Sequence, residues 1–225
     1  MLKYKDIYVK KFLQSGFQIT FENLIIYIDP FKIPKNSPKA NIIFISHEHF
    51  DHLDKKSIEI IQDRETVIVG NSLVRKVLEN IENFIEVQPC SSGTINNIKF
   101  TCVSAFNKNK FNEEGIPYHP KENNGIGYIL DFNKNERIRL FHMGDTDFEI
   151  GEHSIPEIDI LLIPVSGTYV MTPQEAIIAA NTINPKLAIP MHYDAGIAGS
   201  IRDAEKFRDE SEVRVEILDI ENEKV

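Results

Sequence analysis

The stretch from His47 to His52 has the residue types and the spacing of a metal site. Its sequence, His-Glu-His-Phe-Asp-His, places three of the chain's seven histidines and one aspartate within six residues. Cations such as Zn²⁺ bind imidazole nitrogen and carboxylate oxygen, and residues two apart on an extended backbone point to the same side. His47 and His49 can therefore hold one ion. Asp51 and His52 follow Phe50, where the backbone must turn, so that they can hold a second ion.

A histidine is also a common surface or loop residue, and a single one would favour that structural role. Here the apolar run Ile42–Ile45 directly precedes the cluster. Such a run is typical of a buried strand, which would deliver the imidazoles to the edge of a sheet. The cluster and the strand together favour a metal site.

The residues before the cluster predict an antiparallel meander, and those after it predict alternating strands and helices. Asp54 stands at the N-cap of a helix of about two turns, and helical periodicity also spans residues 72–81. Between Asn107 and Gly125 comes a long polar segment, and loops of that length are usually functional or mobile. The predicted strands of this part are Ile7–Val9, Phe17–Phe21, Leu24–Ile28, Thr66–Val69 and short strands between residues 84 and 106 with a turn at Asn96-Asn97.

Two more predicted strands end in side chains that bind metals. A hairpin of strands over 127–132 and 137–142 leads to Asp145, and a strand over 187–190 leads to His192. The remaining predicted elements are a strand over 158–164, a helix from the capping box Thr172-Pro173-Gln174-Glu175 to about Thr182, a helix from Ser200 to about Asp209, and a closing strand over Val213–Leu218.

Length and composition predict one compact domain over residues 1–225, because 42% hydrophobic residues are ample for a core. The net charge of −9 disfavours nucleic acid and anionic membranes as partners, since those surfaces need a basic footprint. Cys90 and Cys102 stand outside any CxxC pattern and are expected to be reduced. The first residues lead into no apolar segment of signal-peptide length, and a cytoplasmic protein without a membrane span is expected.

Three motifs in chain order carry a family resemblance. They are His47-x-His49-x-Asp51-His52, Gly144-Asp145-Thr146 and Pro190-Met191-His192-Tyr193. Their order resembles that of the metallo-β-lactamase fold hydrolases, and the match covers nearly the whole chain. With Ile28-Asp29-Pro30-Phe31 and the segment Gly167–Pro173, the chain is most similar to the small cytoplasmic metal-dependent hydrolases that include relatives of ascorbate-phosphate lactonases. The resemblance implies an α/β fold, the four-layer αββα sandwich, and the alternation of elements is compatible with it.

The resemblance also implies the ligands of two metal ions. A third histidine for the first ion comes, in this family, from the segment before the hairpin of the bridging aspartate. His119 is the histidine of that segment and matches relatives whose ligand precedes a Gly-Tyr strand, whereas other relatives carry the ligand at the position of Asn107. His153 is expected at the surface. The implied ligands are His47, His49 and His119 for the first ion, Asp51, His52 and His192 for the second, and Asp145 as the bridge.

The chemistry that this site implies is hydrolysis by a dinuclear centre. Zn²⁺ is the first choice, with Mn²⁺ or Fe as alternatives, because histidine and carboxylate suit all three. Two such ions would lower the pKa of a bridging water toward ~7 and make hydroxide available. Asp51 would be the catalytic residue that accepts a proton and passes it to the leaving group. Four side chains near the predicted ligands each have two possible roles. Asp29 and His142 either orient imidazoles or are structural. Tyr169 and Tyr193 either donate to an oxyanion or pack in the core.

The leading hypothesis is a hydrolase of a small ester, lactone or phosphodiester. The alternative is an RNA or DNA phosphodiesterase related to the tRNA 3′-processing endonucleases; the acidic charge argues against it, and the loop residues Lys108, Lys110 and Lys121 favour it. A diiron redox enzyme is disfavoured, because that branch has glutamate where this chain has His49. A protein that uses metal only for folding is the remaining alternative.

Overall fold

The computed structural model describes residues 1–79, 81–148 and 155–221 of the chain. By its internal contacts the chain divides into two compact units, which we call the N-terminal unit (Met1–Gln88 with Leu218–Val225) and the C-terminal unit (Pro89–Ile217). One domain over residues 1–225 stays a prediction. His153, expected at the surface, lies outside the described residues.

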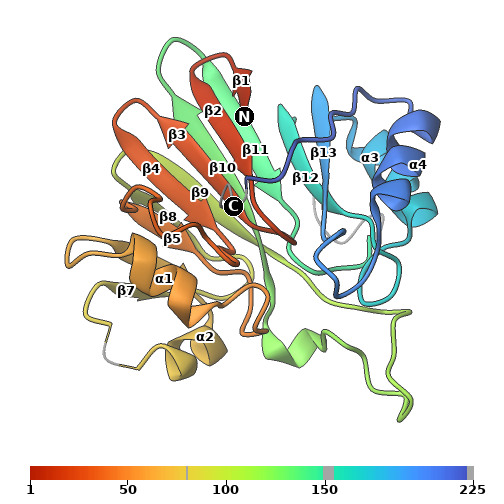
Figure 1. Ribbon diagram of the computed structural model, residues 1–225, viewed down its shortest axis with the longest axis horizontal. Helices are drawn as coiled ribbons and strands as arrows, with labels where there is room; N and C mark the ends of the chain where they lie inside the picture. The colour runs from red at the N-terminus through yellow and green to blue at the C-terminus, as the bar shows by residue number, and fades with distance from the viewer. Residues whose placement is uncertain (80, 149–154, 222–225) are drawn as a thin grey trace. The chain divides into compact units, whose positions relative to one another are not determined.

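The N-terminal unit is built on a seven-stranded sheet with the strands in chain order. Its first four strands form the predicted antiparallel meander, and β4 to β7 run parallel to one another. Figure 1 shows the meander as neighbouring red and orange strands. The sequence prediction missed β1, which has three residues and no apolar run. The strands are β1 (Leu2–Tyr4), β2 (Ile7–Lys11), β3 (Phe17–Phe21), β4 (Leu24–Ile28), β5 (Ile42–Phe44), β6 (Val67–Gly70) and β7 (Phe84–Glu86).

Two short helices, α1 (Lys55–Ile61) and α2 (Ser72–Val77), pack on this sheet. As predicted, Asp54 caps α1, because its side chain accepts the N–H of Lys56 at 3.1 Å. Helix α2 is shorter than the predicted 72–81, since Leu78 leaves the helical region with φ −97° and ψ 55°. The helices bury an apolar face against the sheet in one cluster, which includes Ile58 and Ile61 of α1, Val74 of α2, Ile43 of β5 and Ile68 of β6.

The C-terminal unit is built on a six-stranded sheet in the order β13-β12-β11-β10-β9-β8. Strands β8 to β11 are antiparallel, and β11 to β13 are parallel. Asn96 and Asn97 join β8 to β9 with φ values of 48° and 65°, the conformation that the predicted two-residue turn requires. The strands are β8 (Ser92–Ile95), β9 (Ile98–Ser104), β10 (Ile126–Asn133), β11 (Arg137–His142), β12 (Ile160–Pro164) and β13 (Leu187–Met191).

Helices α3 (Pro173–Ile183) and α4 (Ile201–Glu210) lie together beside β12 and β13 (Figure 1). Both begin with the predicted capping residues, and each has a complete capping box. Their apolar faces join the core of this unit, which includes Ala176, Ala180, Phe207, Leu161 and Ile163. A 3₁₀ turn, η1 (Lys121–Asn123), ends the long loop before β10. No helix in the described ranges is both long and apolar enough to span a membrane.

The predicted closing strand over Val213–Leu218 is wrong. Of these residues only Val215 makes a bridge to the sheet, opposite Ala188 of β13. Ala188 donates to Arg214 O at 2.9 Å and accepts from Glu216 N at 3.0 Å. The next residue of β13 on this edge is Pro190, which has no N–H to donate, so the ladder cannot extend.

Candidate metal centre

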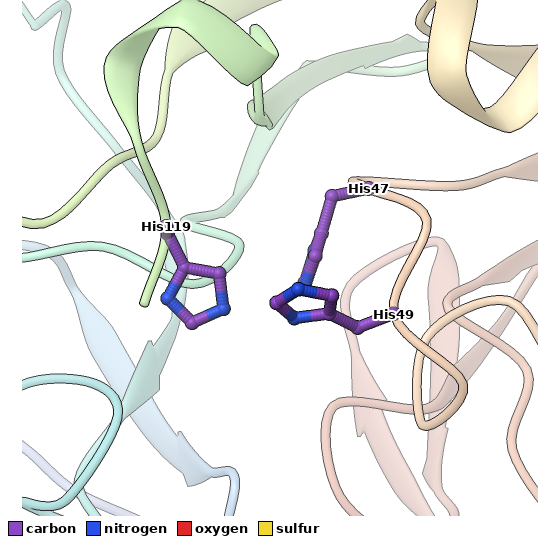
Figure 2. Close-up of side chains that lie close together, drawn as sticks. All are labelled: His47, His49 and His119. Atoms are coloured by element: carbon purple, nitrogen blue, oxygen red, sulfur yellow. The ribbon is translucent and has the colours of Figure 1, made fainter. Parts of the chain in front are cut away.

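The loop that follows β5 carries the first group of predicted ligands. The N–H of Ile45 bonds to Val69 O at 2.9 Å and prolongs the pairing to the start of the loop. Figure 2 shows the imidazoles of His47 and His49 next to each other on this loop, and their ring centroids are 4.6 Å apart. The chain then turns, because the N–H of His52 bonds to His49 O at 3.0 Å. This turn brings the ring of His52 to 4.1 Å from that of His47. Three imidazoles therefore converge within one loop.

Asp29, at the end of β4, orients two of these imidazoles. Its carboxylate is fully buried and accepts from Ser46 N at 2.7 Å, from Ser46 Oγ at 2.6 Å and from His52 Nδ1 at 2.7 Å. Because the Ser46 hydroxyl donates to Asp29, its oxygen accepts from His47 Nδ1 at 2.9 Å. Both histidines thus carry their proton on Nδ1 and the lone pair on Nε2. Of the two roles left open for Asp29, the structure supports the orienting one, since its carboxylate holds the imidazole of His52 directly and that of His47 through Ser46.

The C-terminal unit holds the second group, gathered around Asp145. This residue follows β11 through Gly144, whose N–H bonds to His142 Nδ1 at 3.2 Å. Gly144 has φ 68°, and a Cβ there would lie 2.7 Å from Ile126 O, so the turn needs glycine. The Oδ2 atom of Asp145 lies 3.2 Å from His119 Nε2 and 3.0 Å from His192 Nε2. One carboxylate oxygen therefore faces two imidazole nitrogens, and His142 supports the turn that presents it.

The sequence left open whether His119 or Asn107 stands at the position of the third ligand of the first metal ion. The Asn107 Oδ1 atom accepts from His119 N at 3.0 Å and from His119 Nδ1 at 2.8 Å, while its Nδ2 donates to Asp147 Oδ1 at 3.2 Å. The Asn107 side chain is thus committed to holding the imidazole, and His119 has the geometry of the ligand. Figure 2 shows the ring of His119 projecting from the long loop before β10.

His192 receives the same kind of support from a serine. It follows β13 in the left-handed region, with φ 61°, and its Nδ1 lies 2.9 Å from Ser166 Oγ. The sequence predicted neither the contact of Ser166 with His192 nor that of Ser46 with His47. Ser166 is 26 residues from His192 in the chain, and a serine carries no metal-binding signal of its own.

Within each unit the predicted ligands lie close together: His47, His49, Asp51 and His52 share one loop of the N-terminal unit, and His119 and His192 face Asp145 in the C-terminal unit. In four of the five histidines Nδ1 is engaged by Asp29, Ser46, Asn107 or Ser166. A partner that can only accept, such as a carboxylate or amide oxygen, fixes the proton on Nδ1, and each of these second bonds aims Nε2, which is how proteins prepare histidine for a cation. The donor set of imidazole and carboxylate therefore fits a borderline divalent metal.

The loop after Asn107 is tied to the first turn of α3. Lys110 is buried and bonds to Glu175 Oε2 at 2.8 Å, with Asp147 Oδ1 at 3.6 Å. Partial desolvation raises the pKa of Glu175, but hydrogen bonds from Lys110, Thr172 and Asn109 outweigh it and hold the pKa at about 2. From the sequence alone Lys110 could bind nucleic acid, but in the structure it pairs with the carboxylates of Glu175 and Asp147.

The two tyrosines near the ligands differ in setting. Tyr193 is 1% exposed and belongs to the apolar core of the C-terminal unit, which confirms the packing role. Tyr169 packs edge-on against Tyr118 of the long loop, with ring centroids 4.8 Å apart. Tyr193 therefore packs in the core, and Tyr169 packs against the long loop.

Comparison with known proteins shows the family of this chain. Residues 8–192 match the family described as the β-lactamase superfamily domain. A UPF0173 metal-dependent hydrolase of Methanoculleus marisnigri is 32% identical over 177 residues, which are 75% of this chain and 73% of the relative. A solved structure from Parabacteroides distasonis, assigned as a metal-dependent hydrolase, is 28% identical with a TM-score of 0.80, covering 96% of this chain and 94% of that one.

A more distant structure has the same fold. Igni18, a metallo hydrolase from Ignicoccus hospitalis, matches with a TM-score of 0.73 at 17% identity and covers 95% of both chains. The predicted fold class, the αββα sandwich, is confirmed by these neighbours. The chain therefore belongs to the β-lactamase superfamily domain family and is one of the metallo-β-lactamase fold, metal-dependent hydrolases.

Proposed function

We propose that this protein is a dinuclear metal-dependent hydrolase of a small ester, lactone or phosphodiester. In this proposal the two groups of ligands serve one centre. The first cation would be held by His47, His49 and His119, the second by Asp51, His52 and His192, and Asp145 would contact both. Zn²⁺ is the preferred ion, with Mn²⁺ and Fe as the alternatives that the same donors accept.

The observation that carries the proposal is the set of hydrogen bonds behind the ligands. Asp29, Ser46, Asn107 and Ser166 each contact a histidine Nδ1 at 2.7–2.9 Å. A histidine that only packs or caps needs no common tautomer, whereas His47, His52 and His119, with Nε2 as the basic nitrogen, suit a site that binds cations. The chain's own residues thus prepare the ligands before any ion arrives.

Bound divalent cations supply a water that ionises near neutral pH and a positive charge that polarises the substrate's reacting oxygen. Asp51 is 6% exposed and follows His49 by two residues, which places its carboxylate at the same loop as the histidines. It accepts a proton from the attacking water and returns it to the leaving oxygen. The buried surroundings of Asp145 and His192 exclude bulk water and strengthen these electrostatic contacts.

The substrate class is proposed to be small and not nucleic acid. The net charge is −9, and Lys110 of the long loop is paired with Glu175, which weakens the case for a nuclease. The lactone option rests on the resemblance to relatives of ascorbate-phosphate lactonases. Esters and phosphodiesters share with lactones a polarisable oxygen and an oxygen leaving group, so one screen can separate them.

The test is a hydrolysis screen over lactones, phosphodiesters and esters with wild type, Asp51→Ala and Glu59→Ala. Glu59 is an exposed carboxylate on α1 and serves as the matched control. We expect Asp51→Ala to lose at least ~100-fold in activity, the scale of lost acid–base catalysis, and Glu59→Ala to keep it. Metal analysis should find two ions per chain. Activity that survives in Asp51→Ala would refute the mechanism, and a single ion per chain would refute the dinuclear centre.

A further inference from the structure

Gln14 occupies the turn between β2 and β3 in a conformation that its side chain disfavours. Its φ is 53°, in the left-handed region, and the residue is completely buried. Glycine or asparagine would be the ordinary choice at such a position. A strained backbone that persists at a buried residue indicates that the side chain has a use.

That side chain reaches Asp51. The Gln14 Nε2 atom donates to Asp51 Oδ2 at 2.9 Å, across 37 residues of sequence and within the N-terminal unit. Asp51 Oδ2 also lies 3.8 Å from His52 Nε2. The amide therefore holds the carboxylate on the side of the neighbouring ligand and restrains its rotation.

Lys11 stabilises the backbone of this turn by hydrogen bonds. This lysine is fully buried, and its Nζ donates to Gln14 O at 3.1 Å and to Phe12 O at 3.0 Å. Backbone bonds from Phe12 N to Gly16 O at 2.7 Å and from Gly16 N to Leu13 O at 3.0 Å close the loop. The amide of Gln14 thus projects from a backbone with little freedom, which is what accurate positioning requires.

We infer that Gln14 is a positioning residue for Asp51, selected because it is a neutral donor. An arginine or lysine in its place would also bond the carboxylate, but its positive charge would oppose a divalent cation at the same oxygen atoms. An amide restrains the carboxylate and leaves its negative charge for the metal. The inference rests on the proposed function, in which Asp51 is both a ligand of the second cation and the group that moves the proton.

The test compares Gln14→Met with Gln18→Met by titration of the protein with Zn²⁺ alone. Methionine keeps the length of the side chain and removes the donor. Gln18 is a matched control, because it is 5% exposed in the same unit and its amide donates to Thr20 Oγ1. We expect Gln14→Met to raise one of two Zn²⁺ dissociation constants ten- to a hundred-fold and to leave the other unchanged. This is the usual effect of removing a hydrogen bond to a metal ligand. Gln18→Met should leave both unchanged.

A second variant separates positioning from a backbone role. Gln14→Asn keeps the amide and suits φ 53° better, but it draws the donor back by one C–C bond, ~1.5 Å. If reach to Asp51 matters, this variant unfolds at the same temperature as wild type or higher and still loses the affinity of one Zn²⁺. Unchanged Zn²⁺ affinities in both variants would overturn the role of Gln14. Wild type that binds fewer than two Zn²⁺ ions would instead overturn the proposed function.

Discussion

Replacing Asp29 by asparagine should disable His52 as a ligand while it preserves the size of the side chain. Asp29 accepts three bonds, from Ser46 N, Ser46 Oγ and His52 Nδ1. An asparagine presents one oxygen and one NH₂ group. If the NH₂ faces His52, the imidazole must accept at Nδ1 and carry its proton on Nε2, where a cation would have to bind. If the NH₂ faces Ser46 N instead, two donors meet in a fully buried place.

The cost follows from those three bonds. A hydrogen bond to a charged group is worth about 1.5–3 kcal/mol and one between neutral groups about 0.5–1.5 kcal/mol, so each loses roughly 1 kcal/mol when the charge is removed. Three bonds of 2.6–2.7 Å therefore predict a loss of about 3 kcal/mol in the free energy of unfolding. The wrong tautomer of His52 should in addition weaken Zn²⁺ binding about 10–100-fold.

The assay is calorimetric Zn²⁺ titration together with urea unfolding of the metal-free protein. Glu59→Gln is the matched control, since it makes the same exchange of carboxylate for amide at an exposed position of α1 in the same unit. We expect this control to keep both quantities within about 0.5 kcal/mol of wild type. The reasoning about the tautomer would be refuted by an Asp29→Asn protein that binds Zn²⁺ with wild-type affinity, because His52 would then have kept its lone pair on Nε2.

Two further predictions concern the C-terminal unit. Asn107→Ala removes both acceptor bonds to His119, so we expect Zn²⁺ affinity to fall about 10–100-fold and the chelator concentration that strips the metal to fall in parallel; an unchanged affinity would contradict the orienting role. Glu175→Gln keeps the capping box but removes the charge that faces Lys110. Because the pKa of Glu175 is lowered to about 2 in the folded protein, its ionised form stabilises above the ordinary pKa of 4.5, and this contribution disappears as the pH falls toward 2. We expect Glu175→Gln to cost about 1 kcal/mol at pH 7 in this partly exposed pair and progressively less as the pH falls from 4.5 through 2, and a cost independent of pH in urea unfolding would contradict the assignment.

The elements that carry the predicted ligands were predictable because their signals are local. Apolar runs of strand length precede His47 and His192, and the hairpin before Asp145 has its turn residues in place. Caps such as Asp54 and Thr172 act on N–H groups two or three residues away. Interactions of this range depend on a few neighbouring residues, so the sequence carries them without knowledge of the fold.

The closing strand over Val213–Leu218 shows where local signals mislead. Its alternation of apolar residues is typical of a strand, yet pairing needs a partner edge with donors. That edge belongs to β13, where Pro190 interrupts it. A propensity within one segment does not report on the segment that it must pair with.

The sequence by itself determined which residue types this protein offers to a cation and at which strand ends they stand. Only the tertiary structure decided that Nε2 is the basic nitrogen of His47, His52 and His119, that Asn107 holds His119, and that Gln14 holds Asp51. These partners are 12 and 37 residues apart in the chain, and a serine, an asparagine or a glutamine has no spacing rule that announces such a role. Ligands are selected by their own chemistry, but their orientation depends on which distant segments the packed core brings within hydrogen-bond distance.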